Sequence, residues 1–464
     1  MLVVLMPIFE MSVDEVVNGI RAGRFTACIV GLGRMGLPMA CVLAEAGFNV
    51  VGVDVDKGVV ELVNSGRGFD DEPGLNECVG EWFSKGKLRA TTDFSVIKES
   101  DVIFIVVPTK AVENKPDYSI LYSASRSIGG FLARGSLVVL CSTVGPLITE
   151  RIVKRALEES SGLKAEVDFG LAYSPIRATA GRVIRDLKSY PRIVAGLSEK
   201  SLELASAIIG CTTSGGVIKV SSVRVAEMVK LAENVYRDVN IALANELALI
   251  CEKLGVDYNE VANAANTQPF CHLHVPGLGV GGHCIPHNPY FIIDYALTEG
   301  VRPILMLTAR SVNDSMPKHT VKLIIDGLRE IGKDIEKSVI AILGAAFKPD
   351  SADPRYSPVE QLCDELELRG AKVKVYDPLI SVNKLKDMGY DAYDELEEAV
   401  EEADCLVIAM PHTVLKEILN SKLKEIGEMM RRPALIVDCW RILDYRKAMS
   451  LGFKYKAVGR GIEG

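Results

Sequence analysis

Residues 26–36 read TACIVGLGRMG, an apolar run that leads directly into three glycines. A helical pattern follows, and residues 50–54 (VVGVD) form a second apolar run that ends in Asp54. A strand, a glycine turn, a helix and a second strand that ends in an acid about twenty residues after the glycines make up the dinucleotide-binding fingerprint. The stretch therefore predicts a parallel, doubly wound α/β sheet at the front of the chain.

The residues of this turn have separate roles in such a site. Gly31 permits the tight turn, Gly33 lets the backbone approach a pyrophosphate, and Gly36 allows the helix to pack closely on the strand. Asp54 can accept hydrogen bonds from a ribose 2′-hydroxyl and would repel a 2′-phosphate, so we expect NAD rather than NADP. Met35, in the same turn, completes this set of cofactor-binding candidates.

Two further apolar strands are predicted at residues 101–107 and 137–140. Short polar residues follow both, and the carboxyl ends of buried parallel strands are where open α/β sheets bind ligands. Thr143 is expected to face the cofactor or the substrate, with a turn-forming hydroxyl as the alternative. The cofactor-binding candidates after these strands are Pro108, Thr109, Ser142 and Thr143.

The last third of the chain repeats this pattern. Residues 371–377 (AKVKVYD) again end in an acid, and ADCLVIAMP at 403–411 parallels SDVIFIVVP at 100–108. The second copy lacks the glycine fingerprint and has FKPD at 347–350 with Arg355 nearby, which indicates a different phosphate-bearing ligand. We therefore predict an α/β fold of two Rossmann-like doubly wound domains.

Residues 223–254 lie between the two repeats and form one long helical pattern without proline. Such a helix, about 45 Å long and apolar on much of its circumference, is suited to join the two domains and to form a dimer surface. Lys230 and Asn234 are four residues apart and therefore lie on one face, although solvent exposure is the default alternative for both. The expected domains span residues 1–220 (NAD-binding), 221–320 (central, helical, with the dimer surface and a cysteine loop) and 321–464 (second Rossmann-like domain).

The cysteine loop reads PGLGVGGHCIPHNP at residues 276–289, with four glycines crowded against Cys284. So bare a backbone suits close approach to a ligand, because glycine offers conformations and clearances that no other residue has. We interpret Cys284 as a thiol presented at the edge of a ligand-wrapping loop. A surface turn that happens to contain a cysteine is the alternative.

Zinc binding is a second alternative for this region. Six potential ligands are close together in sequence, but they do not show the paired spacing of a structural zinc site, and no metal is expected. The six are Cys271, His272, His274, His283, Cys284 and His287.

The bulk composition is that of an ordinary globular protein, with 48% hydrophobic and 25% charged residues in a chain of 464. This length predicts roughly two to three domains. The formal net charge of −8 argues against a nucleic-acid partner. The eleven cysteines are scattered, so a reducing cytoplasm is expected rather than a disulfide framework. No signal peptide is expected in the apolar N-terminal residues, and no membrane helix in the chain, because no run reaches ~20 apolar residues.

A dinucleotide site at the front, a phosphate site at the back and a cysteine between them suit the oxidation of a nucleotide-linked molecule. Removing hydride from an alcohol needs only a base. A thiol becomes useful when an aldehyde must be oxidised further, because the thiolate adds to the carbonyl, and the adduct gives up hydride to leave a thioester that water cuts. The cysteine therefore favours two successive oxidations.

The chain resembles the UDP-glucose/GDP-mannose dehydrogenase family over nearly its whole length, and its VGGHCIP run is most similar to the branch that acts on UDP-N-acetyl-D-mannosamine. The matching stretches are GLGRMG, VPT, STV, EMVKLAEN, PGLGVGGHCIP, GAAFKPDSADPRYSP and VDCW. The resemblance implies an NAD-dependent, four-electron oxidation of the sixth-carbon alcohol of a UDP-sugar to the uronate, as in polysaccharide biosynthesis. It also implies a UDP-sugar-binding role for residues 321–464 and a homodimer or dimer of dimers.

The resemblance also implies residue roles. Cys284 matches the covalent nucleophile, and Lys230 and Asn234 match a helix pair that holds the reacting oxygen and a catalytic water. Thr143 matches a threonine near that water, and Arg355 matches an arginine that binds a cofactor phosphate. The other substrate-binding residues that the resemblance implies are Gly279, Gly281, Gly282, Phe347 and Lys348.

Two positions depart from the family pattern. The chain has Ile176 where the family usually has a glutamate, and Asn288 where it usually has an aspartate four residues after the cysteine. Both family carboxylates are associated with water or with the thiol, so the departures concern thioester hydrolysis, in which Asn288 remains a catalytic candidate. We hypothesise that an imidazole, His287 or His283, takes over part of the proton transfer.

Two other functions compete with this interpretation. A β-hydroxyacid-type two-electron dehydrogenase would explain GLGRMGLPMA but needs no Cys284 and leaves the last third unused. A nucleotide-sugar-binding protein without turnover would explain Ile176 and Asn288. Within the favoured interpretation, N-acetylmannosamine, N-acetylglucosamine and glucose remain alternatives, because the choice depends on side chains around the sugar ring.

Overall fold

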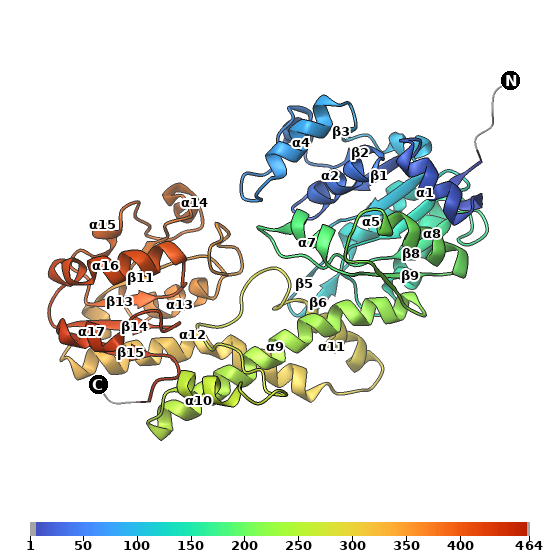
Figure 1. The fold of residues 1–464 in the computed structure, drawn as a ribbon. Coiled ribbons are helices and arrows are strands. Elements are labelled where there is room, and N and C mark those ends of the chain that lie inside the picture. Colours follow the sequence, from blue (N-terminus) through green and yellow to red (C-terminus); the bar gives the residue numbers. More distant parts are fainter. Residues whose placement is uncertain (1–5, 462–464) are drawn as a thin grey trace. The chain divides into compact units, whose positions relative to one another are not determined.

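The computed structural model describes residues 6–461, so the N-terminal residues 1–5, on which the expected absence of a signal peptide partly depends, lie outside it. The chain divides into two compact units. The first comprises Met1–Glu233 and Tyr290–Val301, and the second comprises Asn234–Pro289 and Arg302–Gly464 (Figure 1). The three-part division expected from the sequence stays a prediction.

The first unit is built on an eight-stranded sheet with the order β10-β9-β8-β7-β4-β1-β2-β3. All neighbouring strands are parallel except β8 and β9, which are antiparallel. The strands are β1 (Thr26–Val30), β2 (Asn49–Val53), β3 (Leu88–Thr91), β4 (Val102–Ile105), β7 (Leu137–Leu140), β8 (Gly170–Tyr173), β9 (Arg192–Gly196) and β10 (Val217–Lys219). A separate antiparallel hairpin pairs β5 (Lys110–Val112) with β6 (Lys115–Asp117).

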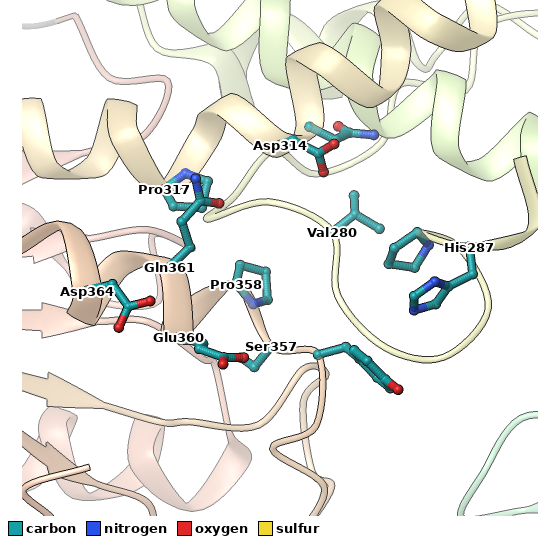
Figure 2. Close-up of a pocket in the computed structure, with 12 residues that line it drawn as sticks. Val280, His287, Asp314, Pro317, Ser357, Pro358, Glu360, Gln361 and Asp364 are labelled. Atoms are coloured by element: carbon teal, nitrogen blue, oxygen red, sulfur yellow. The ribbon is translucent and has the colours of Figure 1, made fainter. Parts of the chain in front are cut away.

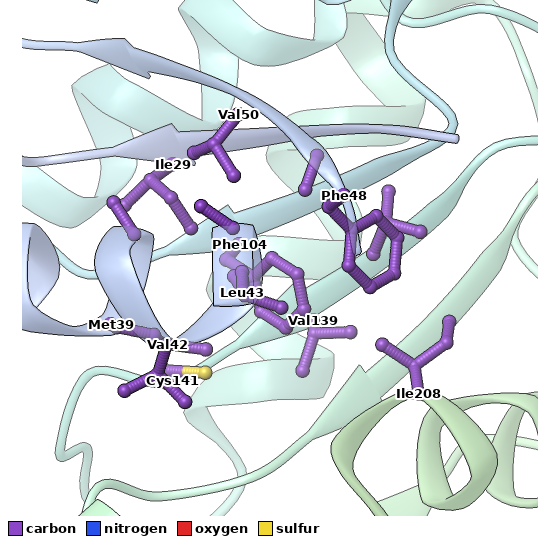
Figure 3. Close-up of a cluster of buried hydrophobic side chains, with 14 of the residues drawn as sticks. Ile29, Met39, Val42, Leu43, Phe48, Val50, Phe104, Val139, Cys141 and Ile208 are labelled. Atoms are coloured by element: carbon purple, nitrogen blue, oxygen red, sulfur yellow. The ribbon is translucent and has the colours of Figure 1, made fainter. Parts of the chain in front are cut away.

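Helices cover both faces of this sheet. They are α1 (Val13–Arg21), α2 (Gly36–Ala46), α3 (Lys57–Asn64), α4 (Leu75–Ser84), α5 (Ser119–Gly129), α6 (Arg155–Ser161), α7 (Val183–Ser189) and α8 (Glu199–Gly210). Most of α11 (Asn288–Thr298) also belongs to this unit. The central strands are buried at almost every position, which is why they read as continuous apolar runs rather than alternating ones. In one face of the core, Ile29, Phe104 and Val139 from three neighbouring strands pack with Leu43 of α2 and Ile208 of α8 (Figure 3).

The second unit contains a five-stranded, fully parallel sheet with the order β12-β11-β13-β14-β15. Its strands are β11 (Val339–Leu343), β12 (Lys372–Tyr376), β13 (Cys405–Ile408), β14 (Ala434–Asp438) and β15 (Phe453–Ala457). Its helices are α10 (Tyr258–Ala265), α12 (Ile304–Glu330), α13 (Pro358–Glu367), α14 (Val382–Asp387), α15 (Leu396–Val400), α16 (Thr413–Met429) and α17 (Tyr445–Ser450). The predicted pair of doubly wound domains is thereby confirmed.

Helix α9 (Val223–Leu254) has 32 residues and the bounds that the sequence pattern predicts. It begins in the first unit and ends in the second, because the division falls between Glu233 and Asn234. Within residues 6–461, no helix combines the length and the apolar character needed to cross a membrane. Short 3₁₀ helices at η1 (Ile8–Glu10), η2 (Phe94–Glu99) and η4 (Ile335–Lys337) and a π-helix at η3 (Thr149–Lys154) complete the structure.

Candidate active site

The glycine turn between β1 and α2 leaves room for a ligand at one position. A Cβ atom at Gly31, whose φ is +97°, would lie 2.5 Å from the Val106 carbonyl oxygen, and one at Gly36 would lie 1.8 Å from the Gly31 oxygen. At Gly33 a Cβ atom would meet no atom of the described residues within 4 Å. The first and third glycines are therefore required by packing, and the second leaves space for a pyrophosphate.

The acid that ends β2 braces the same turn. Asp54 Oδ2 accepts a hydrogen bond from Leu32 N at 2.7 Å, and its Oδ1 accepts one from Asp56 N at 3.0 Å. A carboxylate has further acceptor positions for a ribose hydroxyl. Helix α2 starts at Gly36, and its N-cap residue Met35 supplies no side-chain cap, so the positive end of the helix dipole at this turn is available to favour an anion. The residues present thus fit NAD.

The polar residues that follow β4 and β7 lie together at the carboxyl edge of the sheet. Thr109 Oγ1 donates to the Thr143 carbonyl oxygen at 2.5 Å, and Ser142 Oγ donates to the Val107 carbonyl oxygen at 2.6 Å. Pro108 is exposed at the same edge. The Ser142 hydroxyl is buried and bonded to backbone, so its immediate role is to join the ends of the two strands.

Sequence reasoning missed Glu227, which anchors the segment after Thr143. The Glu227 carboxylate accepts hydrogen bonds from Leu147 N at 2.8 Å, Thr149 N at 2.9 Å and Thr149 Oγ1 at 2.6 Å. Burial raises the pKa of this carboxyl group, and the three donors oppose that shift. Glu227 lies one helical turn before Lys230 on α9, so it ties the Thr143 segment to the part of the helix that carries the lysine.

Lys230 and Asn234 are both buried, with 9% and 5% of their surface exposed, so the alternative that both are solvated is wrong. Asn234 Nδ2 donates to Asn288 Oδ1 at 2.5 Å, and Asn288 N donates to the Cys284 carbonyl oxygen at 2.9 Å. The side chain of Cys284 is exposed. The structure therefore brings together α9, the start of α11 and the cysteine loop through three of the predicted catalytic residues.

The glycines of the cysteine loop pack against protein. A Cβ atom at Gly281 would lie 2.6 Å from the Tyr356 carbonyl oxygen, and one at Gly282 would lie 2.6 Å from the ring of Phe347. Gly279 has a φ of +130°, which only glycine adopts readily. The sequence interpretation assigned these glycines to ligand approach, and the structure gives them a packing reason as well.

A buried polar network fixes the start of this loop. Asn245 of α9 accepts a hydrogen bond from Gly277 N at 3.0 Å and donates to Asn313 of α12 at 2.9 Å. Asn313 donates to Asp238 at 2.8 Å, and Arg310 donates to the same carboxylate at 2.5 Å. Burying an ion pair is costly unless such additional bonds satisfy it, and here they connect α9, α12 and the loop. No sequence motif singles these residues out.

The two histidines of the loop have different surroundings. His283 Nε2 lies 3.3 Å from Asp353 Oδ2, and its ring meets those of Phe347 and Tyr356 edge-on. His287 packs edge-on against Tyr356 and lines a cavity of about 300 Å³ with residues from α12 and from the start of α13 (Figure 2). Within residues 6–461, no group of three or more His, Cys, Asp or Glu side chains is arranged to hold a metal ion, which leaves the zinc alternative without a ligand set.

Arg355 is bonded to a neighbouring acid in the second unit. Its Nε and Nη2 donate to the two oxygens of Asp353, both at 2.8 Å. Burial alone would raise the pKa of Asp353, but the hydrogen bonds from Arg355 and His283 outweigh it and hold the pKa well below its usual range. The structure therefore shows Arg355 ordering the segment that also carries Phe347 and Lys348.

Three family models match the chain in order. They describe the NAD binding domain (residues 25–209), the central domain (residues 224–315) and the UDP binding domain (residues 341–445) of one family. The chain belongs to the UDP-glucose/GDP-mannose dehydrogenase family. A β-hydroxyacid-type enzyme would leave the matched UDP binding domain unexplained.

Known members of this family are similar to the chain over nearly its full length. The UDP-N-acetyl-D-mannosamine dehydrogenase of Pyrococcus horikoshii is 36% identical over 433 residues, which cover 93% of this chain and 99% of the relative. The solved structure of the UDP-D-ManNAc dehydrogenase of Pyrococcus horikoshii has a TM-score of 0.88 at 35% identity and covers 94% of this chain and 100% of that one. The NDP-N-acetyl-D-galactosaminuronic acid dehydrogenase of Methanosarcina mazei has a TM-score of 0.83 at 34% identity, with coverage of 98% and 99%.

Membership in the UDP-glucose/GDP-mannose dehydrogenase family fixes the reaction class. The matched NAD binding domain lies on the sheet that carries the glycine turn and Asp54, and the matched UDP binding domain lies on the second sheet. The protein is an NAD-dependent dehydrogenase that oxidises a UDP-sugar. The predictions of fold, enzyme class and cofactor are confirmed.

Proposed function

We propose that the protein oxidises the sixth-carbon alcohol of UDP-N-acetyl-D-mannosamine to the carboxylate through a covalent intermediate on Cys284. The observation that carries the proposal is an exposed thiol on a packed glycine loop, joined through Asn288 to Asn234 of α9. The choice of sugar is supported by the relatives from Pyrococcus horikoshii and Methanococcus maripaludis, which are both named UDP-N-acetyl-D-mannosamine dehydrogenase.

The reaction consists of two oxidations and a hydrolysis. The alcohol first loses a hydride and a proton to become an aldehyde, and the Cys284 sulfur then adds to the carbonyl carbon to give a thiohemiacetal. Loss of a second hydride from the carbon and of the proton from its hydroxyl leaves a thioester, and water cleaves the carbon–sulfur bond to release the carboxylate, a proton and the thiol. NAD, when bound, accepts the hydrides, one for each of two cofactor molecules.

The remaining site residues have binding and positioning roles in this proposal. The Lys230 ammonium stabilises negative charge that develops on the substrate oxygen, because a fixed cation in a dry site is worth more than in water. Asn234 and Thr143 hold the reacting oxygen and the catalytic water. Gly279, Gly281, Gly282, Phe347 and Lys348 bind the substrate, and the glycine turn, Asp54 and the residues after β4 and β7 bind NAD, with Arg355 at a cofactor phosphate.

Thioester hydrolysis has to proceed without the two carboxylates usual in the family. Ile176 is 7% exposed and belongs to an apolar cluster, so it cannot orient water. Asn288 accepts the hydrogen bond from Asn234 that a carboxylate would also accept, but an amide cannot act as a base. An imidazole of the loop, His287 or His283, therefore carries protons for the water, since an imidazole nitrogen can accept a proton that an amide cannot.

Replacing His287 with alanine tests this assignment. We expect the first oxidation to persist while the release of uronate slows about tenfold to a hundredfold, because general-base assistance to the water is lost. The measurement is single-turnover NADH formation followed by quantification of free uronate. His272→Ala is the matched control, because His272 lies on the same chain segment outside the glycine loop. Unchanged rates for both steps in His287→Ala, with slow release in His283→Ala, would assign the role to His283.

We further propose a homodimer, or a dimer of dimers, in the cytoplasm. Tyr236, Leu243 and Ile250 recur at seven-residue intervals on α9 and are 55%, 43% and 49% exposed, which gives the helix an apolar stripe. None of the eleven cysteines is in a disulfide, which is compatible with a reducing compartment. Sedimentation analysis of the wild-type protein and of the Leu243→Asp variant measures the oligomeric state.

A panel of UDP-sugars assayed with NAD tests the proposed function. UDP-N-acetyl-D-mannosamine is expected to be oxidised with two NADH formed per sugar and an acid as product, and UDP-N-acetyl-D-glucosamine and UDP-glucose are expected to react much more slowly. One NADH per sugar with an aldehyde product would contradict the covalent route through Cys284. Binding of UDP-sugars in a calorimeter without any NADH would contradict turnover altogether.

A further inference from the structure

The acid that ends β12 occupies the same place in the second sheet that Asp54 occupies in the first, but its surroundings are different. Asp377 Oδ2 accepts hydrogen bonds from Ala345 N at 2.7 Å and Ala346 N at 3.2 Å, and its Oδ1 accepts them from Leu379 N at 2.9 Å and Ile380 N at 3.2 Å. The Asp377 side chain is fully buried. Its acceptor positions are thus used by the protein itself, and the carboxylate is not available to a ribose.

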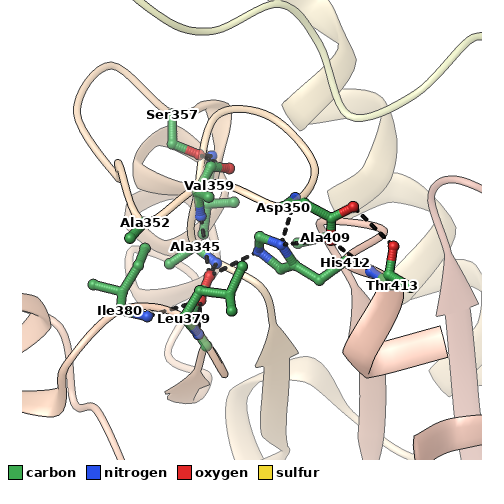
Figure 4. Close-up of polar contacts among 12 residues, drawn as sticks. Ala345, Asp350, Ala352, Ser357, Val359, Leu379, Ile380, Ala409, His412 and Thr413 are labelled. Atoms are coloured by element: carbon green, nitrogen blue, oxygen red, sulfur yellow. Dashed lines mark hydrogen bonds and ion pairs between the residues drawn. The ribbon is translucent and has the colours of Figure 1, made fainter. Parts of the chain in front are cut away.

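A buried histidine completes this arrangement. His412 Nε2 lies 3.2 Å from Asp377 Oδ2, and His412 Nδ1 accepts a hydrogen bond from Asp350 N at 2.9 Å (Figure 4). Because Nδ1 accepts, the ring proton is on Nε2, and His412 donates to Asp377. The imidazole is 0% exposed, and its two nitrogens link Asp377 to the backbone of Asp350.

Asp350 is held from its side chain as well as from its backbone. Its Oδ1 accepts from Thr413 N and its Oδ2 from Thr413 Oγ1, both at 2.8 Å. A carboxylate at the first N–H group of α16 is favoured by the helix dipole, and the hydrogen bonds to Thr413 lower the pKa of Asp350. Asp350 has a φ of +54°, a left-handed conformation that a residue other than glycine keeps only when its surroundings hold it there.

The two anchors lie on either side of a short turn. Ala345 and Ala346 are held at one end by Asp377, Asp350 is held at the other by His412 and Thr413, and the Asp377–His412 bond closes the ring. Phe347 and Lys348 lie between the anchors. The ring of Phe347 packs on Gly282 and on His283 of the cysteine loop, so the position of the turn bears directly on that loop.

We propose that Asp377 and His412 are positioning residues that hold the 345–350 turn, and with it Phe347 and Lys348, in the conformation that binds the UDP end of the substrate. The proposal rests on the proposed UDP-sugar function. Asp377, which follows β12, thus has a structural role in the second sheet. Asp54, which follows β2 in the first sheet, keeps acceptor positions open for a ribose.

The test compares two substitutions of His412 in the full-length protein. His412→Leu removes both hydrogen bonds, whereas His412→Gln offers an amide oxygen to Asp350 N and an amide N–H to Asp377. We expect His412→Leu to weaken UDP binding in calorimetry at least about tenfold and His412→Gln to stay within about threefold of wild type, because a buried donor and acceptor left without partners destabilise the ordered turn. The affinity for NADH, measured by fluorescence, is expected to be the same in all three proteins.

A variant at a more exposed position tests the proposal if the His412→Leu protein does not fold. Asp350→Ala removes the bonds to Thr413 at a half-exposed position, and we expect it to weaken UDP binding about threefold or more with an unchanged thermal midpoint. The steady-state pattern for these variants is a raised KM for the UDP-sugar with a smaller change in kcat. UDP binding at wild-type strength in a folded His412→Leu protein overturns the proposal, as does equal weakening of UDP and NADH binding.

Failure of the proposed function gives a different result. If the wild-type protein does not bind UDP, the UDP-sugar assignment of the second sheet is wrong. Hydrogen exchange of residues 345–350 then tests separately whether His412 holds the turn. Faster exchange in His412→Leu but not in His412→Gln supports the role of His412 in holding the turn, and unchanged exchange overturns it.

Discussion

Replacing Cys284 with alanine is expected to reduce the formation of uronate at least about a thousandfold, because the thiohemiacetal and the thioester both require the sulfur. Interconversion of the sixth-carbon alcohol and aldehyde needs no thiol, so the variant should still reduce the aldehyde with NADH. The measurements are uronate by mass spectrometry in the forward direction and NADH consumption with the aldehyde in the reverse direction.

Cys271→Ala is the matched control for this experiment. Cys271 lies thirteen positions earlier, is only partly exposed and is outside the glycine loop. It should retain wild-type rates in both directions. Formation of two NADH per sugar by Cys284→Ala would contradict the covalent route and would leave the glycine loop with a binding role alone.

Replacing Lys230 with methionine is the second substitution with a large expected effect. We expect kcat to fall about a hundredfold to a thousandfold, the range seen when one preorganised group that stabilises an oxyanion is removed. Methionine keeps the length and apolar stem of the side chain, which matters because Lys230 is 9% exposed. Lys230→Arg should not restore the rate, since a planar guanidinium places its charge differently from an ammonium.

The control for Lys230 lies near the end of the same helix. Lys253 is exposed in the last turn of α9, and Lys253→Met should leave kcat and the thermal midpoint unchanged. NADH affinity should be equal in wild type and both variants, because neither lysine belongs to the glycine turn. A loss of kcat below about fivefold in Lys230→Met would mean that the lysine is not needed for charge stabilisation.

The buried strands of both sheets could be predicted because parallel strands covered on both faces read as continuous apolar runs. The bounds of β1, β7 and α9 agree with the predicted ranges. The strand predicted at 101–107 is longer than β4 (Val102–Ile105), because the apolar pattern continues through Val106 and Val107 past the last paired residue. The β5–β6 hairpin was not predicted, because its strands are short, polar and exposed.

The positioning residues could not be predicted for a different reason. Glu227 reaches Thr149 across 78 positions, and His412 reaches Asp350 across 62, so neither contact leaves a local pattern in the sequence. The motif residues, by contrast, are recognisable because backbone geometry constrains them locally, as at Gly31 and Gly36. The glycines at 281 and 282 were found by the same signal, but their contact with the 347–356 segment emerges only in three dimensions.

The contrast between the acids that end β2 and β12 has a consequence for how enzymes of this type diversify. The two sheets share no strand, so mutations around Asp377 can change the recognition of UDP without altering the NAD-binding turn around Asp54. Substitutions around Asp377 are therefore expected to change the affinity for UDP while the affinity for NAD stays the same.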